Sequence, residues 1–139
     1  MAVLWDEELA TGIELIDNQH REIFRRVDIL LDACKEHRGK VEVGGFLNFL
    51  EDYVVEHFSA EENIQRHFQY PGYAAHKKLH EEFIKSVDGL REQFEREGPS
   101  LMMVVNTSQV VVDWFVKHIR KVDKALAEFL KTHGYKEPV

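Results

Sequence analysis

Four residues of types that bind metal ions lie within one short stretch of the chain. His57 and Glu61 form the first pair. His76 and His80 form the second, and in both pairs the two residues are four positions apart. On an α-helix this spacing places both side chains on one face, one turn apart, where they can bind one metal ion or two adjacent ions. Tyr70-Pro71-Gly72 lies between the pairs and is expected to end one helix and let the next return antiparallel. The stretch therefore predicts a metal site between two facing helices.

Three more candidate ligands lie outside this stretch, namely His20, His118 and Asp123. Together with the two pairs they make seven ionisable residues, five of them histidines on apolar helical stripes. A single histidine on an apolar face is usually a hydrogen-bonded core residue. Burying seven ionisable groups without a cation, however, would cost several kcal/mol each in desolvation. The pattern therefore favours a shared metal centre.

His118 and Asp123 are five positions apart, which does not suit a regular α-helix. That spacing turns roughly 140° around the helix axis, too far for both side chains to face one ion. A π-type widening near Ile119 to Val122, or a bend there, would bring them together. In a straight α-helix Asp123 would instead be an exposed partner for Lys121 or Lys124.

The chain has eight histidines, and the remaining three are His37, His67 and His133. Each lies close to the expected C-terminus of a helix. There a partly cationic ring interacts favourably with unsatisfied carbonyl groups and with the negative end of the helix dipole. We interpret these three as structural.

Apolar residues recur at helical spacing in the segments that must position the candidate ligands. The expected helices run from about residue 18 to a stop at Gly39, and over about 41–67, 73–96 and 101–132. Asp17 or Asn18 is the expected N-cap of the first helix, and Ser100 is that of the fourth. Four amphipathic helices joined by short turns predict an all-α fold, an antiparallel up-down-up-down four-helix bundle.

Residues 1–17 are expected to form a non-helical arm, because Gly12 interrupts their apolar residues. Trp5 in this arm is interpreted as a hydrophobic plug laid over the bundle. The whole chain, residues 1–139, has the length of a single domain, with the bundle over about 18–132.

Composition argues against several classes of protein. A hydrophobic fraction of 44% and a charged fraction of 31% are typical of a soluble globular protein. No apolar run is long enough to span a membrane, and the first residues show no secretory signal. The lone Cys34 cannot form an internal disulfide, so the cytoplasm is the expected location. The net charge of −7 argues against a nucleic-acid partner.

The candidate ligands, taken in order, resemble those of the hemerythrin family, and specifically of its single-domain bacterial members, the bacteriohemerythrins. The family's pattern is one early His followed by H-x-x-x-E, H-x-x-x-H and H-x-x-x-x-D, and all seven positions match in type and spacing. The resemblance covers nearly the whole chain. Surrounding residues that are also similar to the family are Gly12-Ile13, Ile16-Asp17, Gln19, Glu61-Glu62, Tyr70-Pro71 and Trp114.

This resemblance implies two non-haem iron ions bridged by an oxo or hydroxo group, with dioxygen as the ligand. One iron would be bound by His76, His80 and His118, and the other by His20 and His57. Both irons would be bridged by Glu61 and Asp123. The second iron would then be one ligand short, and dioxygen is expected to bind there. Imidazole nitrogen suits iron, and five neutral imidazoles should favour oxygen binding over O–O cleavage.

The resemblance also implies an apolar pocket around the dioxygen. Its walls would be Ile23, Phe58, Trp114, Phe115 and Ile119, although ordinary bundle core is an equally valid interpretation of these residues. Phe115 stands where an aliphatic residue such as Leu is expected, which would narrow the access of dioxygen. Gln65 replaces a Met often found in the family, and no function is assigned to that change.

The leading hypothesis is reversible dioxygen binding for storage, delivery or sensing, the latter two with an unidentified protein partner. A competing hypothesis is a di-iron enzyme, namely an oxidase, a peroxidase or a nitric-oxide scavenger, that uses the same site. The sequence shows no obvious proton donor near the open iron, which weakens the enzyme hypothesis. An iron store and a helical scaffold with an incidental zinc ion are two further hypotheses.

Overall fold

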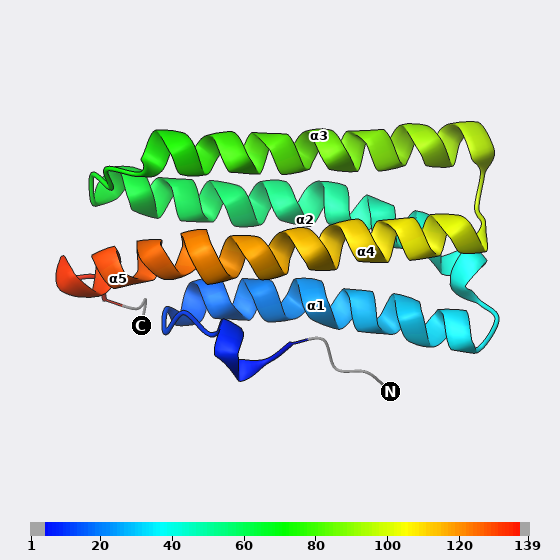
Figure 1. Cartoon of the computed structure of the whole chain (residues 1–139), viewed down its shortest axis with the longest axis horizontal. Helices are drawn as coiled ribbons and strands as arrows, with labels where there is room; N and C mark the ends of the chain where they lie inside the picture. The colour runs from blue at the N-terminus through cyan, green and yellow to red at the C-terminus, as the bar shows by residue number, and fades with distance from the viewer. Residues whose placement is uncertain (1–4, 137–139) are drawn as a thin grey trace.

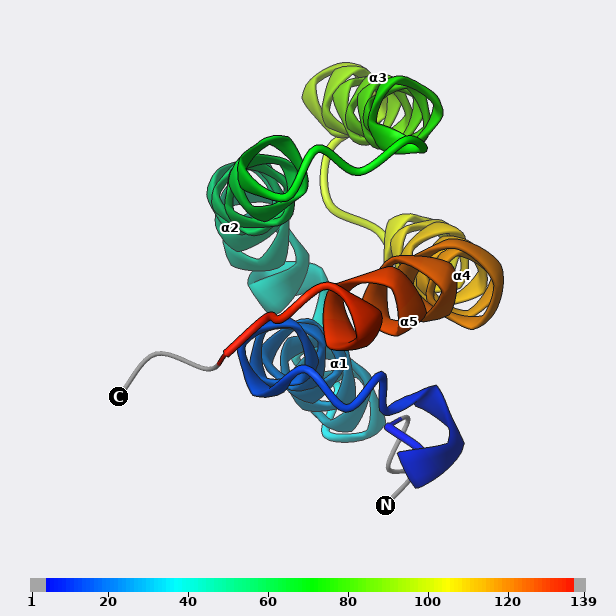
Figure 2. The same ribbon diagram turned by 90° about the vertical axis from the view of Figure 1, so that its left-hand side faces the viewer.

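The computed structural model describes residues 5–136, and these form four long antiparallel rods (Figure 1). The first three rods are α1 (Glu14–Lys35), α2 (Gly39–His67) and α3 (Tyr73–Glu97). The fourth rod is continuous and consists of α4 (Leu101–His118), the π-helical segment η2 (Ile119–Asp123) and α5 (Lys124–Thr132). Viewed along the rods, Figure 2 shows them surrounding one interior. The predicted up-down-up-down bundle is confirmed.

The predicted boundary between arm and bundle at residue 17 is wrong. A short 3-10 helix, η1 (Glu7–Leu9), lies within the arm, and α1 begins at Glu14 rather than after Asp17. Asp17 lies inside α1, where its Oδ1 accepts hydrogen bonds from N and Oγ1 of Thr11, both at 2.8 Å, and its Oδ2 accepts one from Gly12 N at 3.1 Å. Gly12 has a φ of 88°, a conformation that glycine adopts without strain. The carboxylate thus fixes the loop from within the first helix.

The predicted stop of the first helix at Gly39 is also wrong, because α1 ends at Lys35 and Gly39 is the first residue of α2. A Cβ at this position would lie 3.0 Å from the Cα of Cys34. The glycine therefore permits a close approach of two helices. By contrast, the predicted cap of the fourth rod is confirmed, because Ser100 Oγ accepts a hydrogen bond from Met103 N at 3.0 Å. The third rod ends at Glu97, one residue beyond its predicted end.

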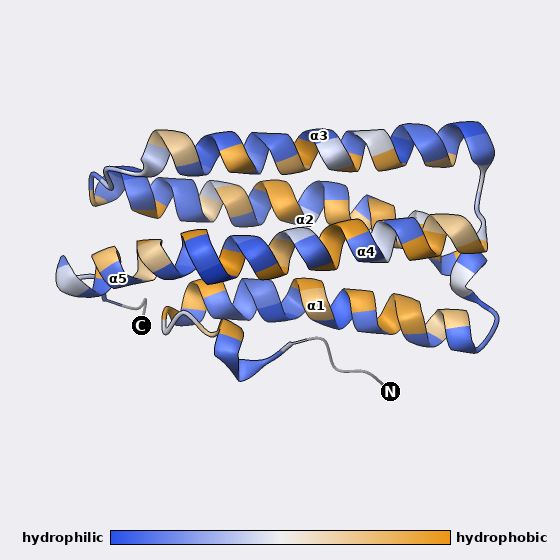
Figure 3. Ribbon diagram, viewed as in Figure 1, coloured by the Kyte–Doolittle hydropathy of each residue, from blue (hydrophilic) through white to orange (hydrophobic). Residues whose placement is uncertain are grey.

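Two apolar clusters fill the interior. Hydrophobic and hydrophilic residues alternate along every rod, as expected of amphipathic helices (Figure 3). The larger cluster includes Ile23 and Ile119, and the smaller includes Ile16 and Leu126. Positions 20 and 123 fall between these two clusters along their rods. Trp5 is partly buried against the larger cluster, with its ring 6.0 Å from that of Phe24, as the predicted plug requires. Among the described residues, no helix is long and apolar enough to cross a membrane.

Candidate metal centre

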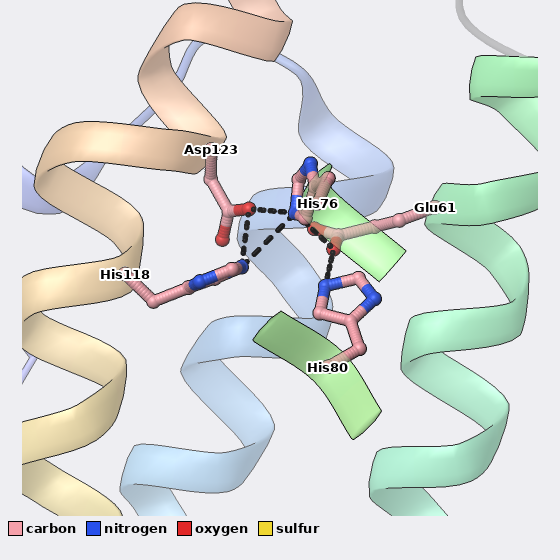
Figure 4. Close-up of side chains that lie close together, drawn as sticks. All are labelled: Glu61, His76, His80, His118 and Asp123. Atoms are coloured by element: carbon pink, nitrogen blue, oxygen red, sulfur yellow. Dashed lines mark hydrogen bonds and ion pairs between the residues drawn. The ribbon is translucent and has the colours of Figure 1, made fainter. Parts of the chain in front are cut away.

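The bundle brings all seven predicted ligands together in its interior, and every one of them is buried. The first rod contributes one, the second and third contribute two each, and the fourth contributes two. In that order they are His20; His57 and Glu61; His76 and His80; and His118 and Asp123. Five of these side chains converge in Figure 4. Asp123 is buried, which excludes the alternative that it is an exposed partner for Lys121 or Lys124.

The fourth rod widens where the spacing of His118 and Asp123 required it. Residues Ile119–Asp123 form a π-helical turn, and the N–H of Lys124 donates to the carbonyl of Ile119, five residues earlier. His118 Nε2 consequently lies 3.1 Å from Asp123 Oδ1. The predicted π-type widening is confirmed, and it places both side chains on the inner face.

The ligand atoms form two groups, each compact enough to surround one metal ion. One group holds five residues, whose ligand atoms all lie within 4.8 Å of one another, and the other holds three. The larger comprises Glu61, His76, His80, His118 and Asp123, and the smaller comprises His20, His57 and Glu61. Because Glu61 belongs to both, the two positions are adjacent.

The oxygens of Glu61 divide between the two groups. Oε1 lies 3.2 Å from His80 Nε2 and 3.7 Å from His76 Nε2. Oε2 lies 3.5 Å from His57 Nε2 and 3.8 Å from His20 Nε2. One carboxylate oxygen therefore faces the three-histidine side and the other faces the two-histidine side.

Asp123 divides in the same way. Its Oδ1 lies 3.0 Å from His76 Nε2 and 3.1 Å from His118 Nε2. Its Oδ2 lies 3.1 Å from His20 Nε2. Two carboxylates that each direct one oxygen to each side have the arrangement expected of bridging ligands.

Burial of two carboxylates together shifts their pKa values apart. Burial raises the pKa of Glu61 to about 8, and the charge of Asp123 acts in the same direction. Burial also opposes ionisation of Asp123, but the nearby His118 and close polar contacts with the imidazoles of His118, His20 and His76 hold its pKa well below its usual value. One carboxylate is therefore ionised at neutral pH, and the other retains its proton unless more positive charge is supplied.

The histidines divide in a similar way. Burial lowers the pKa of His57, His80 and His118, that of His80 to about 4, and repulsion between neighbouring imidazoles adds to the effect. Burial also disfavours the charged form of His20 and His76, but their close polar contacts with Asp123 outweigh it and raise their pKa values. Three of the five imidazoles are thus neutral at pH 7, the form that binds metal.

Three side chains hold the outer nitrogens of these histidines. Nδ1 of His57 lies 2.6 Å from Gln19 Oε1, and Nδ1 of His80 lies 2.9 Å from Glu62 Oε2. Nδ1 of His76 lies 3.0 Å from the amide nitrogen of Gln65. Sequence reasoning assigned no role to these three residues. Positions 62 and 65 follow Glu61 on the inward side of α2, a weak signal, whereas the contact of Gln19 depends on packing between α1 and α2.

Several buried ligand atoms have no hydrogen-bond partner within residues 5–136. Such atoms indicate whether the site is suited to a metal ion. They are Nε2 of His20 and His80 and all four carboxylate oxygens of Glu61 and Asp123. An unsatisfied buried polar group costs about 1–3 kcal/mol, and a charged one costs more. Imidazole nitrogens with carboxylate oxygens form a donor set that suits iron. The residues present therefore fit a pair of iron ions.

Aromatic rings cover the candidate centre on the side of the apolar core. The ring of Phe58 stacks on His80 at 3.8 Å, and that of Trp114 stacks on His118 at 4.2 Å. Phe115 is fully buried, and its ring lies 6.1 Å from that of His20 and 6.3 Å from that of His57. The other two predicted wall residues, Ile23 and Ile119, are also fully buried. Phe58, Trp114 and Phe115 therefore lie beside candidate ligands, Ile23 and Ile119 belong to the larger apolar cluster, and the role of all five toward dioxygen stays a prediction.

The three histidines interpreted as structural lie at helix ends and are exposed. His67 is the last residue of α2, and His37 lies in the turn between α1 and α2. Nδ1 of His133 lies 2.8 Å from the carbonyl oxygen of Phe129 in the last turn of α5. None of these three belongs to either group of ligand atoms.

The fold and the donor set define a class, the helical-bundle metal-binding domains. Residues 11–130 match the family model described as the hemerythrin HHE cation binding domain. A bacteriohemerythrin of Stenotrophomonas maltophilia (strain R551-3) is 35% identical over 96% of this chain and 85% of that protein. A myohemerythrin of Sipunculus nudus is 32% identical over 86% of this chain and 87% of that protein. The chain belongs to the hemerythrin family.

Solved structures agree with this assignment. The crystal structure of a wild-type hemerythrin superimposes with a TM-score of 0.79 at 33% identity, covering 94% of this chain and 97% of that one. The four-rod architecture is therefore shared over nearly the full length.

Proposed function

We propose that this chain binds dioxygen reversibly at a non-haem di-iron centre. The observation that carries the proposal is the division of the two carboxylates, each with one oxygen on either side of the cluster. The residues proposed to hold the irons are His76, His80 and His118 on one side, His20 and His57 on the other, and Glu61 and Asp123 as bridges. An oxo or hydroxo group would complete the bridge.

The two sides offer different numbers of protein donors. Three imidazoles and two carboxylate oxygens face one position, and two imidazoles and two carboxylate oxygens face the other. When bound, ferrous iron supplies the electrons that dioxygen takes up and returns. The side of His20 and His57 has one donor fewer, so it is the proposed docking position.

The walls near this position are proposed to exclude water. Phe115, Ile23 and Ile119 are fully buried, and Phe58 is nearly so. These apolar side chains offer no proton to the bound ligand, a property that suits reversible binding. A di-iron enzyme needs a proton supply for turnover, so we regard oxidase, peroxidase and nitric-oxide-scavenging activities as less favoured.

We further propose that the whole chain acts as one domain in oxygen storage, transport or sensing in the cytoplasm. The support for that location is a single cysteine, Cys34, which is free and therefore compatible with a reducing compartment. Delivery or sensing would require a protein partner of unidentified nature.

Anaerobic loading with ferrous iron, followed by cycles of dioxygen and argon, tests the proposed function. We expect two irons per chain, one for each donor group, and a visible spectrum that appears with dioxygen and disappears under argon through repeated cycles. His20→Ala is expected to lose this cycle, whereas His37→Ala, at an exposed turn, is expected to keep it. One iron per chain, release of peroxide, or sustained consumption of a substrate would refute the proposal.

A further inference from the structure

Gln65 lies on α2, one turn beyond Glu61, and its side chain is completely buried. Its amide nitrogen lies 3.0 Å from Nδ1 of His76. Its amide oxygen, Oε1, has no hydrogen-bond partner within the described part of the chain. A buried glutamine with one end on a candidate ligand and the other end unpaired requires an explanation.

The orientation of His76 explains what this glutamine can do. Nε2 of His76 points into the cluster, 3.0 Å from Asp123 Oδ1 and 3.0 Å from His118 Nε2. A metal ion would therefore take Nε2, and Nδ1 would carry the remaining proton. That N–H is buried and needs an acceptor.

A primary amide has a donor end and an acceptor end that exchange places when the group turns by about 180°. In the neutral tautomer of His76 that carries its proton on Nε2, directed at Asp123, Nδ1 is an acceptor and receives a hydrogen bond from the amide nitrogen of Gln65. With a metal on Nε2, Nδ1–H is a donor, and the reversed amide presents Oε1 to it. Gln65 can therefore pair with His76 in both tautomers.

The outer partners of His80 and His57 already face these histidines with an acceptor, so neither needs to reverse. Glu62 is a carboxylate that can only accept from His80 Nδ1, and Gln19 already presents its oxygen to His57 Nδ1. Both contacts hold the tautomer whose Nε2 is free for a metal. His76 is the histidine whose outer partner faces it with a donor.

We propose that Gln65 is a positioning residue for His76, whose amide reverses to accept a hydrogen bond from Nδ1–H when Nε2 binds a metal ion. The inference rests on the proposed di-iron centre. Methionine at this position would fill a similar volume without a strong acceptor. A glutamine here therefore controls the tautomer of His76 in a way that methionine could not.

The test compares Gln65→Met, which removes the acceptor, with Gln65→Glu, which keeps one. Gln109→Met, on the exposed face of α4, is the matched control for the substitution itself. Each iron-loaded protein is assayed for the rate of iron release to a chelator. Proton NMR in H2O and D2O follows exchange of the hyperfine-shifted imidazole N–H signals, and circular dichroism confirms that each variant is folded.

We expect Gln65→Met to release iron about tenfold faster than the wild type, because loss of an outer hydrogen bond typically costs 10–100-fold in metal affinity. One imidazole N–H signal should exchange faster in this variant, and Gln65→Glu should retain protection of that signal. Gln109→Met should match the wild type in both measurements. If Gln65→Met keeps wild-type iron release and N–H exchange, Gln65 has no positioning role, although the di-iron centre stands. If the wild-type protein retains no iron pair, the proposed function fails and this inference fails with it.

Discussion

Protein stripped of metal with a chelator should show a pH dependence of stability that arises from Glu61. Burial and the charge of Asp123 raise the pKa of Glu61 from 4.5 to about 8. Between these values the folded chain keeps a proton that the unfolded chain has released. The resulting stabilisation is fully present below about pH 4.5 and is lost as pH rises through about 8. Glu61→Gln preserves the shape and removes the titration, so this component should disappear.

The size of the effect follows from the shift. One pKa unit corresponds to about 1.36 kcal/mol, so a shift from 4.5 to about 8 corresponds to at most about 5 kcal/mol. The lowered pKa of His80, from 6.5 to about 4, and the lowered pKa of His57 oppose it at lower pH, where rising pH stabilises the folded chain. Above pH 6.5 the contribution of these histidines changes little. Between pH 6.5 and 8 Glu61 should therefore lower the free energy of unfolding by about 1.5 kcal/mol. His20 and His76 are present in both proteins, and the charge of Glu61 helps to raise their pKa values, so the comparison reports Glu61 together with its effect on these two imidazoles.

Urea denaturation followed by circular dichroism, at pH 6.5 and at pH 8, measures this difference. We expect the wild type to lose about 1.5 kcal/mol more unfolding free energy than Glu61→Gln over this interval. Glu56→Gln, on the exposed surface of the same helix, should follow the wild type. Parallel pH profiles for wild type and Glu61→Gln would show that Glu61 is already ionised in the folded chain, and the electrostatic reasoning would fail.

Asp17→Ala removes the acceptor of three hydrogen bonds from the loop before α1 and should lower the free energy of unfolding by about 2 kcal/mol, with an unchanged ratio of iron to protein. An unchanged urea midpoint would contradict this. Phe115→Leu replaces the ring beside His20 and His57 with a smaller side chain, so stopped-flow mixing should show faster dioxygen association. The free energy of unfolding should fall by about 1 kcal/mol. A rate no faster than that of the wild type would exclude Phe115 as a barrier. Gly39→Ala places a methyl group 3.0 Å from Cys34 Cα. This overpacking should lower the free energy of unfolding by about 1–3 kcal/mol, and the melting temperature should fall with it. An unchanged melting temperature would show that the two helices can separate at no cost.

The bundle and its ligand set were predictable because both depend on periodicity within single helices. The pairs at positions 57 and 61 and at 76 and 80 fix an inward face without any knowledge of the other rods. Even the π turn could be anticipated, since His118 and Asp123 cannot share a face of a regular α-helix. Geometry along one helix is thus the part of the site that sequence determines most directly.

Features that depend on contacts between segments could not be predicted. Asp17 has the residue type of an external helix cap, but it holds the preceding loop from within the first turn because Gly12 turns the backbone amides toward it. Gly39 has the composition of a stop signal, and its role as a close-contact residue depends on Cys34 across the turn. Gln65 acquires a role only when His76, from another rod, is placed beside it.

The charges of the cluster link iron binding to the ionisation of Glu61. Asp123 is ionised and is stabilised by close polar contacts with imidazoles, but the second buried carboxylate keeps its proton up to about pH 8. His57 and His80 cannot supply the missing positive charge, because burial keeps both neutral at pH 7. A divalent cation can do so, since it favours the ionised carboxylate and the neutral imidazole together. Glu61 must therefore lose its proton when it bridges the proposed irons, and the same four rods that disfavour this charge in isolation hold it in place once a cation is bound.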